Sequence, residues 1–288
     1  MNNKKHDEDF FRTVYGDEEL EKIKKSGKVN IPSEYSIKPP KKLKFEVDKI
    51  NNEKSTLNER MQLENSMIKF ETKKLKNMET FEDLFIDFKP ENSEKDFRRI
   101  ASSLMANFVI KINSHEYLLT EIEFYCQTIG KDSIHHDPYV HGDDLQKQMS
   151  HWYFHGSGLD LTFGNDLYYG GILIRGIKTK SGGELKYISG PLNVVKELFS
   201  KANKVDEQSI FCLKFKSEVP PLLNEPFFVR RVGLNEKHNK VYFNKKYRAI
   251  VDISSKHPFK EKEKVYKTLK EDSSININLE ELFGYKIK

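Results

Sequence analysis

The segment Tyr117-Leu118-Leu119-Thr120-Glu121-Ile122-Glu123-Phe124-Tyr125 has the composition of a β-strand, with β-branched and aromatic residues between polar ones. Because side chains alternate along a strand, its apolar and polar residues are predicted to lie on opposite faces: Leu118, Ile122 and Phe124 on one, and Glu121, Glu123 and Tyr125 on the other. Two carboxylates and a phenol on one face of an apolar strand are costly to bury without polar partners. Glu123 is therefore the first candidate for a functional residue.

A partner for Glu123 is found further along the chain, in Gly171-Ile172-Leu173-Ile174-Arg175-Gly176-Ile177. This run is also apolar and typical of a strand, with Arg175 as its one cation. A carboxylate and a guanidinium, each placed in a hydrophobic strand, indicate a polar site. The alternative is a buried ion pair without chemistry, because structural ion-pair networks also contain such charges.

Composition restricts the class of protein only broadly. The 288 residues suffice for one large domain or two small ones, and the net charge of +5 permits but does not require a nucleic-acid partner. The two cysteines, Cys126 and Cys212, argue against a disulfide scaffold and against a four-thiolate zinc site. No apolar run approaches the roughly 20 residues that span a bilayer, and no secretory signal is visible. We therefore expect a cytoplasmic protein without a membrane partner.

Two regions are predicted. Residues 1–80 are rich in Lys, Glu and Asn and form an N-terminal extension, with a loose amphipathic helix over 50–77. This extension either packs one helix on the core or serves as a basic arm or docking helix. Residues 81–288 form the catalytic domain, for which we expect an α+β fold with a mixed, mostly antiparallel curved sheet flanked by helices. Its elements are a helix from Ser93, a strand over 159–163, a hairpin turn at 181–183, a helix from Pro191 and strands over 209–215, 227–234 and 241–251.

Histidines gather in the irregular region between the two polar strands: His135, His136, His141, His151 and His155. Such a cluster could hold zinc or iron, which makes a metal-dependent hydrolase or nuclease the main rival function. The spacing of the common zinc motifs is absent, so the histidines could instead bond to backbone or contact phosphate. A third hypothesis is that His141 helps to hold a catalytic water.

Aromatic and basic side chains nearby fit a nucleic-acid partner. Trp152 and Tyr153 could stack on a base, although ordinary core packing is the alternative. Four cations in the later strands and loops could follow a phosphate backbone, or could simply be solvated: Arg230, Arg231, Lys245 and Lys246. No glycine-rich phosphate loop and no Gly-x-Ser-x-Gly turn occur, so nucleotide hydrolysis and serine chemistry have no support.

A series of short segments between residues 95 and 252 resembles the alkyladenine (3-methyladenine) DNA glycosylase family. These segments occur in the family's order: Ile100–Met105 with Phe108–Ile110, Thr120–Tyr125, Asp137–His141, Leu159–Thr162, Gly171–Arg175, Ser189–Pro191 and Arg230–Leu234. The resemblance implies a monofunctional, monomeric enzyme that extrudes a modified base from DNA and leaves an abasic site, with no metal and no cofactor. It also implies that Glu123 activates the attacking water, that Arg175 and His141 position it, and that Tyr125 stacks on the base.

The chain departs from this family in the base pocket. Asp160 stands where the family has an asparagine, so a hydrogen-bond donor is replaced by an acceptor when the carboxyl is ionised. The segment between His141 and Asp160 is short and lacks the family's wedge hairpin, which Tyr153 or Trp152 would have to replace. We therefore expect an alkylated or hypermodified base, such as those of phage DNA, as the substrate. A DNA-binding module of the same fold without activity is the non-enzymatic alternative.

Overall fold

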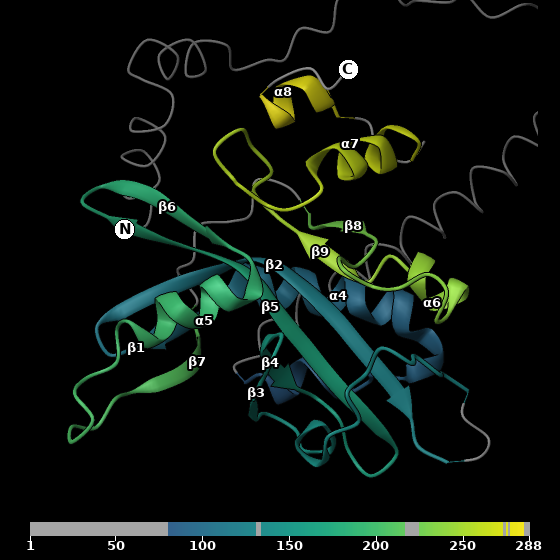
Figure 1. The fold of residues 1–288 in the computed structure, drawn as a ribbon, viewed down its shortest axis with the longest axis horizontal. Helices are drawn as coiled ribbons and strands as arrows, with labels where there is room; N and C mark the ends of the chain where they lie inside the picture. Colours follow the sequence, from purple (N-terminus) through teal and green to yellow (C-terminus); the bar gives the residue numbers. More distant parts are fainter. Residues whose placement is uncertain (1–79, 131–133, 217–224, 273–274, 276, 285–288) are drawn as a thin grey trace, which may run out of the picture. The chain divides into compact units, whose positions relative to one another are not determined.

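The computed structural model describes residues 80–284, apart from 131–133, 217–224, 273–274 and 276 (Figure 1). The predicted extension, with its amphipathic helix over 50–77, therefore lies outside the described residues except for Thr80. Within the described part of the chain, no helix is both long enough and apolar enough to cross a membrane.

The described residues form an α+β fold, which confirms the predicted fold class. Their strands join in one curled antiparallel sheet in the order β3-β4-β5-β2-β1-β7, while β6 pairs with β5, β9 with β2, and β8 with β9. The strands are β1 Phe108–Ile112, β2 His115–Thr128, β3 Trp152–His155, β4 Gly158–Thr162, β5 Tyr168–Ser181, β6 Glu184–Ser189, β7 Phe211–Phe215, β8 Phe227–Val229 and β9 Arg248–Ile250. Figure 1 shows that the long strands β2 and β5 run side by side through the middle of the sheet.

Helices cover parts of this sheet. The α-helices are α4 Ser93–Asn107, α5 Pro191–Phe199, α6 Lys240–Asn244, α7 Lys262–Lys270 and α8 Leu279–Phe283, with short 3-10 turns η2 Glu82–Phe85, η3 Pro90–Asn92 and η4 Asp144–Lys147. α4 packs against β1 and β2, whereas α5 packs against β4, β5 and β6. Aromatic rings fill the space under α4, where the rings of Phe97 and Phe124 stack with their centroids 4.3 Å apart. Burial of these rings fixes the central strand β2 in place.

A bulge in β2 changes which of its residues face the core. The register between β2 and β5 shifts on both sides of Glu121. Tyr117 and Leu119 face the core before the bulge, and Ile122 and Phe124 face it afterwards. The prediction that Leu118 shares a face with Ile122 is therefore wrong, because strict alternation assumes a strand without an inserted residue.

The predicted helix from Pro191 is present as α5; it buries Val194 and Leu198 and leaves Leu192 60% and Phe199 53% exposed. Two later strands differ from the predictions. The strand predicted over 241–251 begins as helix α6, because the Asn239 side chain accepts a hydrogen bond from the Tyr242 N–H and caps a helical turn. Only its second half forms a strand, β9. Strand β8 ends at Val229, earlier than the predicted 227–234.

Candidate active site

A cavity of about 290 Å³ opens beside the middle of the sheet. Its walls come from β2, β4 and β5, from the loop before β3 and from the loop after β8; they include Tyr125, Asp160, Arg175, His141, His155 and Val232. Small-molecule pockets usually have volumes of roughly 300–1,000 Å³, so this cavity lies at the lower end of the range for small-molecule sites.

The structure brings Glu123 and Arg175 together behind this cavity. The Arg175 Nε atom lies 2.7 Å from the Glu121 Oε1 atom and 3.3 Å from the Glu123 Oε1 atom. The same Glu121 Oε1 atom also accepts a hydrogen bond of 2.9 Å from the Arg248 Nε atom. Two carboxylates and two guanidiniums thus form one buried network, in which each charge has an opposite neighbour.

Two further bonds hold the Glu123 carboxylate. Its Oε1 atom accepts the Val232 backbone N–H at 2.7 Å, and its Oε2 atom accepts the Tyr125 hydroxyl at 2.9 Å. Glu123 itself is fully buried, so it does not form part of the cavity surface. It contacts the cavity through Tyr125, Val232 and Arg175, all of which line the cavity.

Burial raises the pKa of Glu123, although Arg175, Arg248 and the Val232 N–H act in the opposite direction. The positive charge of Arg175 favours the ionised carboxylate. That contribution is present, but loss of hydration outweighs it in a fully buried side chain. The carboxyl group therefore takes up a proton at a higher pH than an ordinary glutamate.

Asp160 forms a second polar group in the cavity wall. Its Oδ1 atom lies 3.0 Å from the His155 Nε2 atom, and its Oδ2 atom accepts the Gln146 side-chain amide at 3.4 Å. The Ser157 N–H donates to the His155 Nδ1 atom, so the ring proton of the neutral imidazole lies on Nε2 and is donated to Asp160. Gly171 is required beneath this group, because a Cβ atom there would lie 2.6 Å from the Asp160 Oδ2 atom. The wall therefore presents a fixed acceptor to the cavity.

His141 lies at the cavity mouth and is exposed. Its ring meets the rings of His155 and Tyr153 with centroids 4.3 and 6.0 Å apart. Although the residue as a whole is exposed, partial desolvation of its ring and, after it, the neighbouring His155 lower the pKa of His141, which favours the neutral imidazole. These contacts place His141 beside the Asp160 group rather than on the Glu123 carboxylate.

The other histidines of the cluster do not converge on one point. Burial lowers the pKa of His135 to about 4, and its ring packs against Tyr242 and Tyr247. His136 and His151 are exposed side chains that contact Gln127 and the Met149 carbonyl, respectively. Over the described ranges, no group of three or more His, Cys, Asp or Glu residues is placed to hold a metal ion. The rival hypothesis of a metal-dependent hydrolase or nuclease therefore lacks a ligand set in this part of the chain.

Strand β3 separates the two aromatic residues that were expected to contact a base. Alternation along β3 places Tyr153 beside His141 and His155, next to the cavity. Trp152 points to the opposite face, where its ring stacks on Phe211 with centroids 4.4 Å apart. Trp152 therefore packs against the core, which corrects its predicted role in base binding.

Arg231 is buried and is not one of the exposed surface cations. Its guanidinium forms two bonds with Asp137, of 2.6 and 3.1 Å, and a third of 3.0 Å with the Phe124 carbonyl. It also covers one face of the Tyr125 ring, with 4.5 Å between the guanidinium carbon and the ring centroid. Because both charges of the pair are buried, Arg231 cannot reach a phosphate group on the outer surface. This corrects the role predicted from the sequence.

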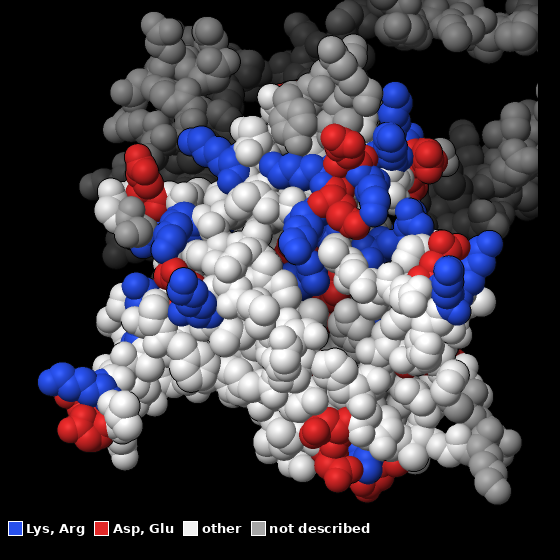
Figure 2. Space-filling model, viewed as in Figure 1, with Lys and Arg blue, Asp and Glu red and all other residues white. Residues whose placement is uncertain are grey.

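The remaining predicted DNA contacts lie at the surface. Lys245 pairs with Glu94 at 2.5 Å, and Lys246 pairs with Asp272 at 3.2 Å. Arg230 is exposed and lies over the Phe243 ring, at 5.5 Å from its centroid. Figure 2 shows that Lys and Arg side chains gather on this side of the molecule, around α6 and α7.

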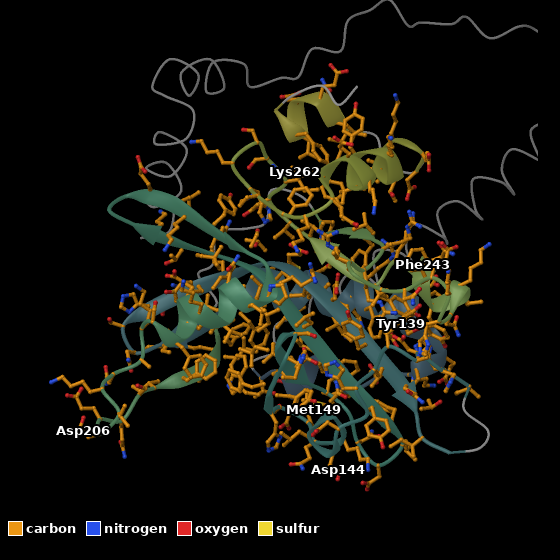
Figure 3. All side chains as sticks on the ribbon, viewed as in Figure 1. Tyr139, Asp144, Met149, Asp206, Phe243 and Lys262 are labelled. Atoms are coloured by element: carbon orange, nitrogen blue, oxygen red, sulfur yellow. The ribbon has the colours of Figure 1, made fainter. Side chains whose placement is uncertain are left out.

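Sequence reasoning missed three residues that build the site. Arg248 is a single cation in the apolar run 247–251, the same signal that identified Arg175. Val232 acts through its backbone N–H, which no side-chain pattern can predict. Tyr139 donates its hydroxyl to the Asn235 and Asn239 carbonyls and so joins the loop after β2 to the segment before α6, where Figure 3 labels it near Phe243.

Comparisons with known proteins add one relative. No protein-family model matches the chain. The chain is similar to the uncharacterized protein L759 of Acanthamoeba polyphaga mimivirus, with 32% identity over 141 residues. The match covers 40% of this chain and 62% of the viral protein, which is less than two thirds of the relative's length.

Proposed function

We propose that this chain is a monofunctional DNA N-glycosylase that extrudes a modified base into the 290 Å³ cavity and hydrolyses its N-glycosidic bond. The observation that carries the proposal is the Glu123 carboxylate, held directly behind the cavity by Arg175, the Val232 N–H and the Tyr125 hydroxyl. The order of sequence segments that resembles the alkyladenine DNA glycosylase family supports the same chemistry. Among the described residues that line the cavity none is a lysine, which favours water as the nucleophile.

The proton leaves the attacking water through Tyr125. Tyr125 lines the cavity and its hydroxyl donates to Glu123, whereas the carboxylate is shielded from the cavity. As the water attacks the anomeric carbon, the N-glycosidic bond breaks and its electron pair leaves with the base, while the water's proton passes to the Tyr125 oxygen and the phenolic proton passes to Glu123. Burial raises the pKa of Tyr125, so both transfers occur together and no phenolate accumulates.

The cavity also fits an extruded base on steric grounds. Arg231 covers one face of the Tyr125 ring and leaves the other face for stacking on a base. Asp160, fixed by His155 and Gln146, accepts a hydrogen from the edge of that base. The preferred substrate is therefore a modified base that carries an amino or hydroxyl hydrogen.

Replacing Tyr125 with Phe separates stacking from proton transfer. The ring remains, but the bond to Glu123 is lost, and with it the path of the proton. We expect the single-turnover rate of base release to fall as far as on removal of the Glu123 base, roughly 10²- to 10⁴-fold, with little change in affinity for DNA. A Tyr125→Phe protein that is as active as the wild type would show that Tyr125 acts only by stacking.

Replacing Asp160 with Asn tests base selection. The carboxylate accepts hydrogen bonds only, whereas the amide also donates, so the variant should favour bases with an acceptor at that edge. We expect the ratio of kcat/KM for an amino-bearing base to that for its deaminated counterpart to fall about tenfold, with base release retained. An unchanged ratio would remove Asp160 from base recognition.

A further inference from the structure

A second cavity, of about 210 Å³, lies between the loop after β8 and helix α7. It shares Gly233 and Leu234 with the first cavity, so one short segment of chain forms a wall of both. Its charged lining residues are predominantly basic: Arg230, Arg231, Arg248 and Lys264, with Glu261 as the acid. Two of these cations, Arg231 and Arg248, also belong to the buried ion pairs with Asp137 and Glu121.

Two buried guanidiniums in this cavity have one nitrogen each without a hydrogen-bond partner within the described structure. These are the Nε atom of Arg231 and the Nη1 atom of Arg248, whose residues are 3% and 0% exposed. A buried donor on a charged group is costly to leave unbonded, so such atoms call for a ligand. Both residues line the same cavity.

The other nitrogens of these side chains fix their positions. Arg231 uses both of its Nη atoms on Asp137, and Arg248 uses its Nε atom on Glu121 and its Nη2 atom on the Lys260 carbonyl. The guanidiniums are therefore held before any ligand arrives. Such preorganised donors lose little conformational entropy on binding.

Two more cations stand at the rim. Arg230 is exposed and is oriented by a bond of 3.2 Å to the Asn244 side chain. Lys264, on α7, pairs with Glu261 at 2.6 Å across an exposed surface. The Glu261 carboxylate repels an incoming anion. Because the Lys264–Glu261 pair is exposed, Lys264 can leave Glu261 and pair with the anion at little cost in free energy.

We propose that the second cavity binds one phosphate group, with Arg231 and Arg248 as buried donors and Arg230 and Lys264 at the rim. Tetrahedral oxyanions have several acceptor oxygens and match guanidinium donors geometrically. The phosphate belongs to a nucleic-acid backbone or to a small free phosphate. The inference goes beyond the proposed function and does not depend on base release.

The test measures binding of two probes, inorganic phosphate by calorimetry and a short duplex DNA by fluorescence anisotropy over a series of salt concentrations. Lys264→Glu should weaken binding at this site about tenfold and reduce the salt slope for DNA by about one. The matched control is Lys267→Glu, which makes the same charge change on the same helix at an exposed residue that does not line the cavity. Glu261→Ala should have the opposite effect and tighten binding.

The binding measurements decide between a backbone phosphate, a free phosphate and no phosphate at this cavity. If Lys264→Glu weakens binding of DNA only, and Lys267→Glu does not, the ligand is a phosphate of the nucleic-acid backbone. If Lys264→Glu also weakens binding of inorganic phosphate, a free phosphate is a ligand of the site. Equal effects of the two variants on both probes, or none, would overturn the proposal. Arg248→Lys, which removes the unbonded Nη1 atom but keeps a cation, should also weaken binding if the protein folds by circular dichroism. A Glu123→Gln protein should bind both probes normally, so failure of the glycosylase proposal remains distinguishable.

Discussion

Glu123→Gln should release modified bases from DNA roughly 10²- to 10⁴-fold more slowly than the wild type, the usual contribution of a general base. The amide has nearly the same shape, so the bonds from Val232 and the neighbouring Glu121–Arg175 pair can persist. What is lost is the acceptor of the proton that arrives through Tyr125. The measurement is single-turnover base release, with DNA affinity determined in parallel; affinity should stay within a few-fold of the wild type.

The pH dependence of the wild type provides an independent check on Glu123. Burial raises the pKa of this carboxyl above the ordinary value of 4.5, and only the ionised form accepts a proton. The rate should therefore be full above the raised pKa and fall as the pH drops through it, with a midpoint above 4.5. Base release that stays constant from neutral pH to below 4.5 would exclude Glu123 as the proton acceptor.

Arg231→Gln should lower the free energy of unfolding by about 3–5 kcal/mol, because it leaves the buried Asp137 carboxylate without its partner. The loss also removes a bond to the Phe124 carbonyl and the cation over the Tyr125 ring. Urea unfolding followed by circular dichroism measures the change.

The adjacent residue offers a matched control for this prediction. Arg230→Gln makes the same substitution at an exposed position and should change stability by no more than about 0.5 kcal/mol. The double variant Asp137→Asn with Arg231→Gln should recover part of the lost stability, because neither charge is then left unpaired. Equal effects of the Arg230 and Arg231 substitutions would contradict the buried-pair assignment.

The centre of the site could be predicted from the sequence because Glu123 and Arg175 are charged residues within two otherwise apolar strands. A charge in such a strand needs an opposite charge nearby, and pairing of β2 with β5 supplies it. The same argument applied to Arg248 would have added the third member of the network. The α+β class followed from the same periodicities.

Other features depended on contacts that local sequence does not contain. The bulge in β2 is set by pairing with β5, so Leu118 was assigned to the wrong face. Nothing in the sequence distinguishes Arg230 from Arg231, yet only Arg231 forms an ion pair with Asp137, which lies far away along the chain. Trp152 and Tyr153 were predicted together, although adjacent residues of a strand must point in opposite directions.

The central claim is that a modified base is cut from DNA at the cavity in front of Glu123. The most direct measurement incubates the wild-type protein with duplex and single-stranded DNAs that carry alkylated, deaminated or hypermodified bases, followed by alkali cleavage at abasic sites. We predict cleavage at the modified position for at least one amino- or hydroxyl-bearing base, in the presence or absence of chelator, and cleavage that is at least about 10²-fold slower with Glu123→Gln. Salt-dependent DNA binding without abasic sites across the whole panel would contradict the claim and favour a DNA-binding module without catalysis.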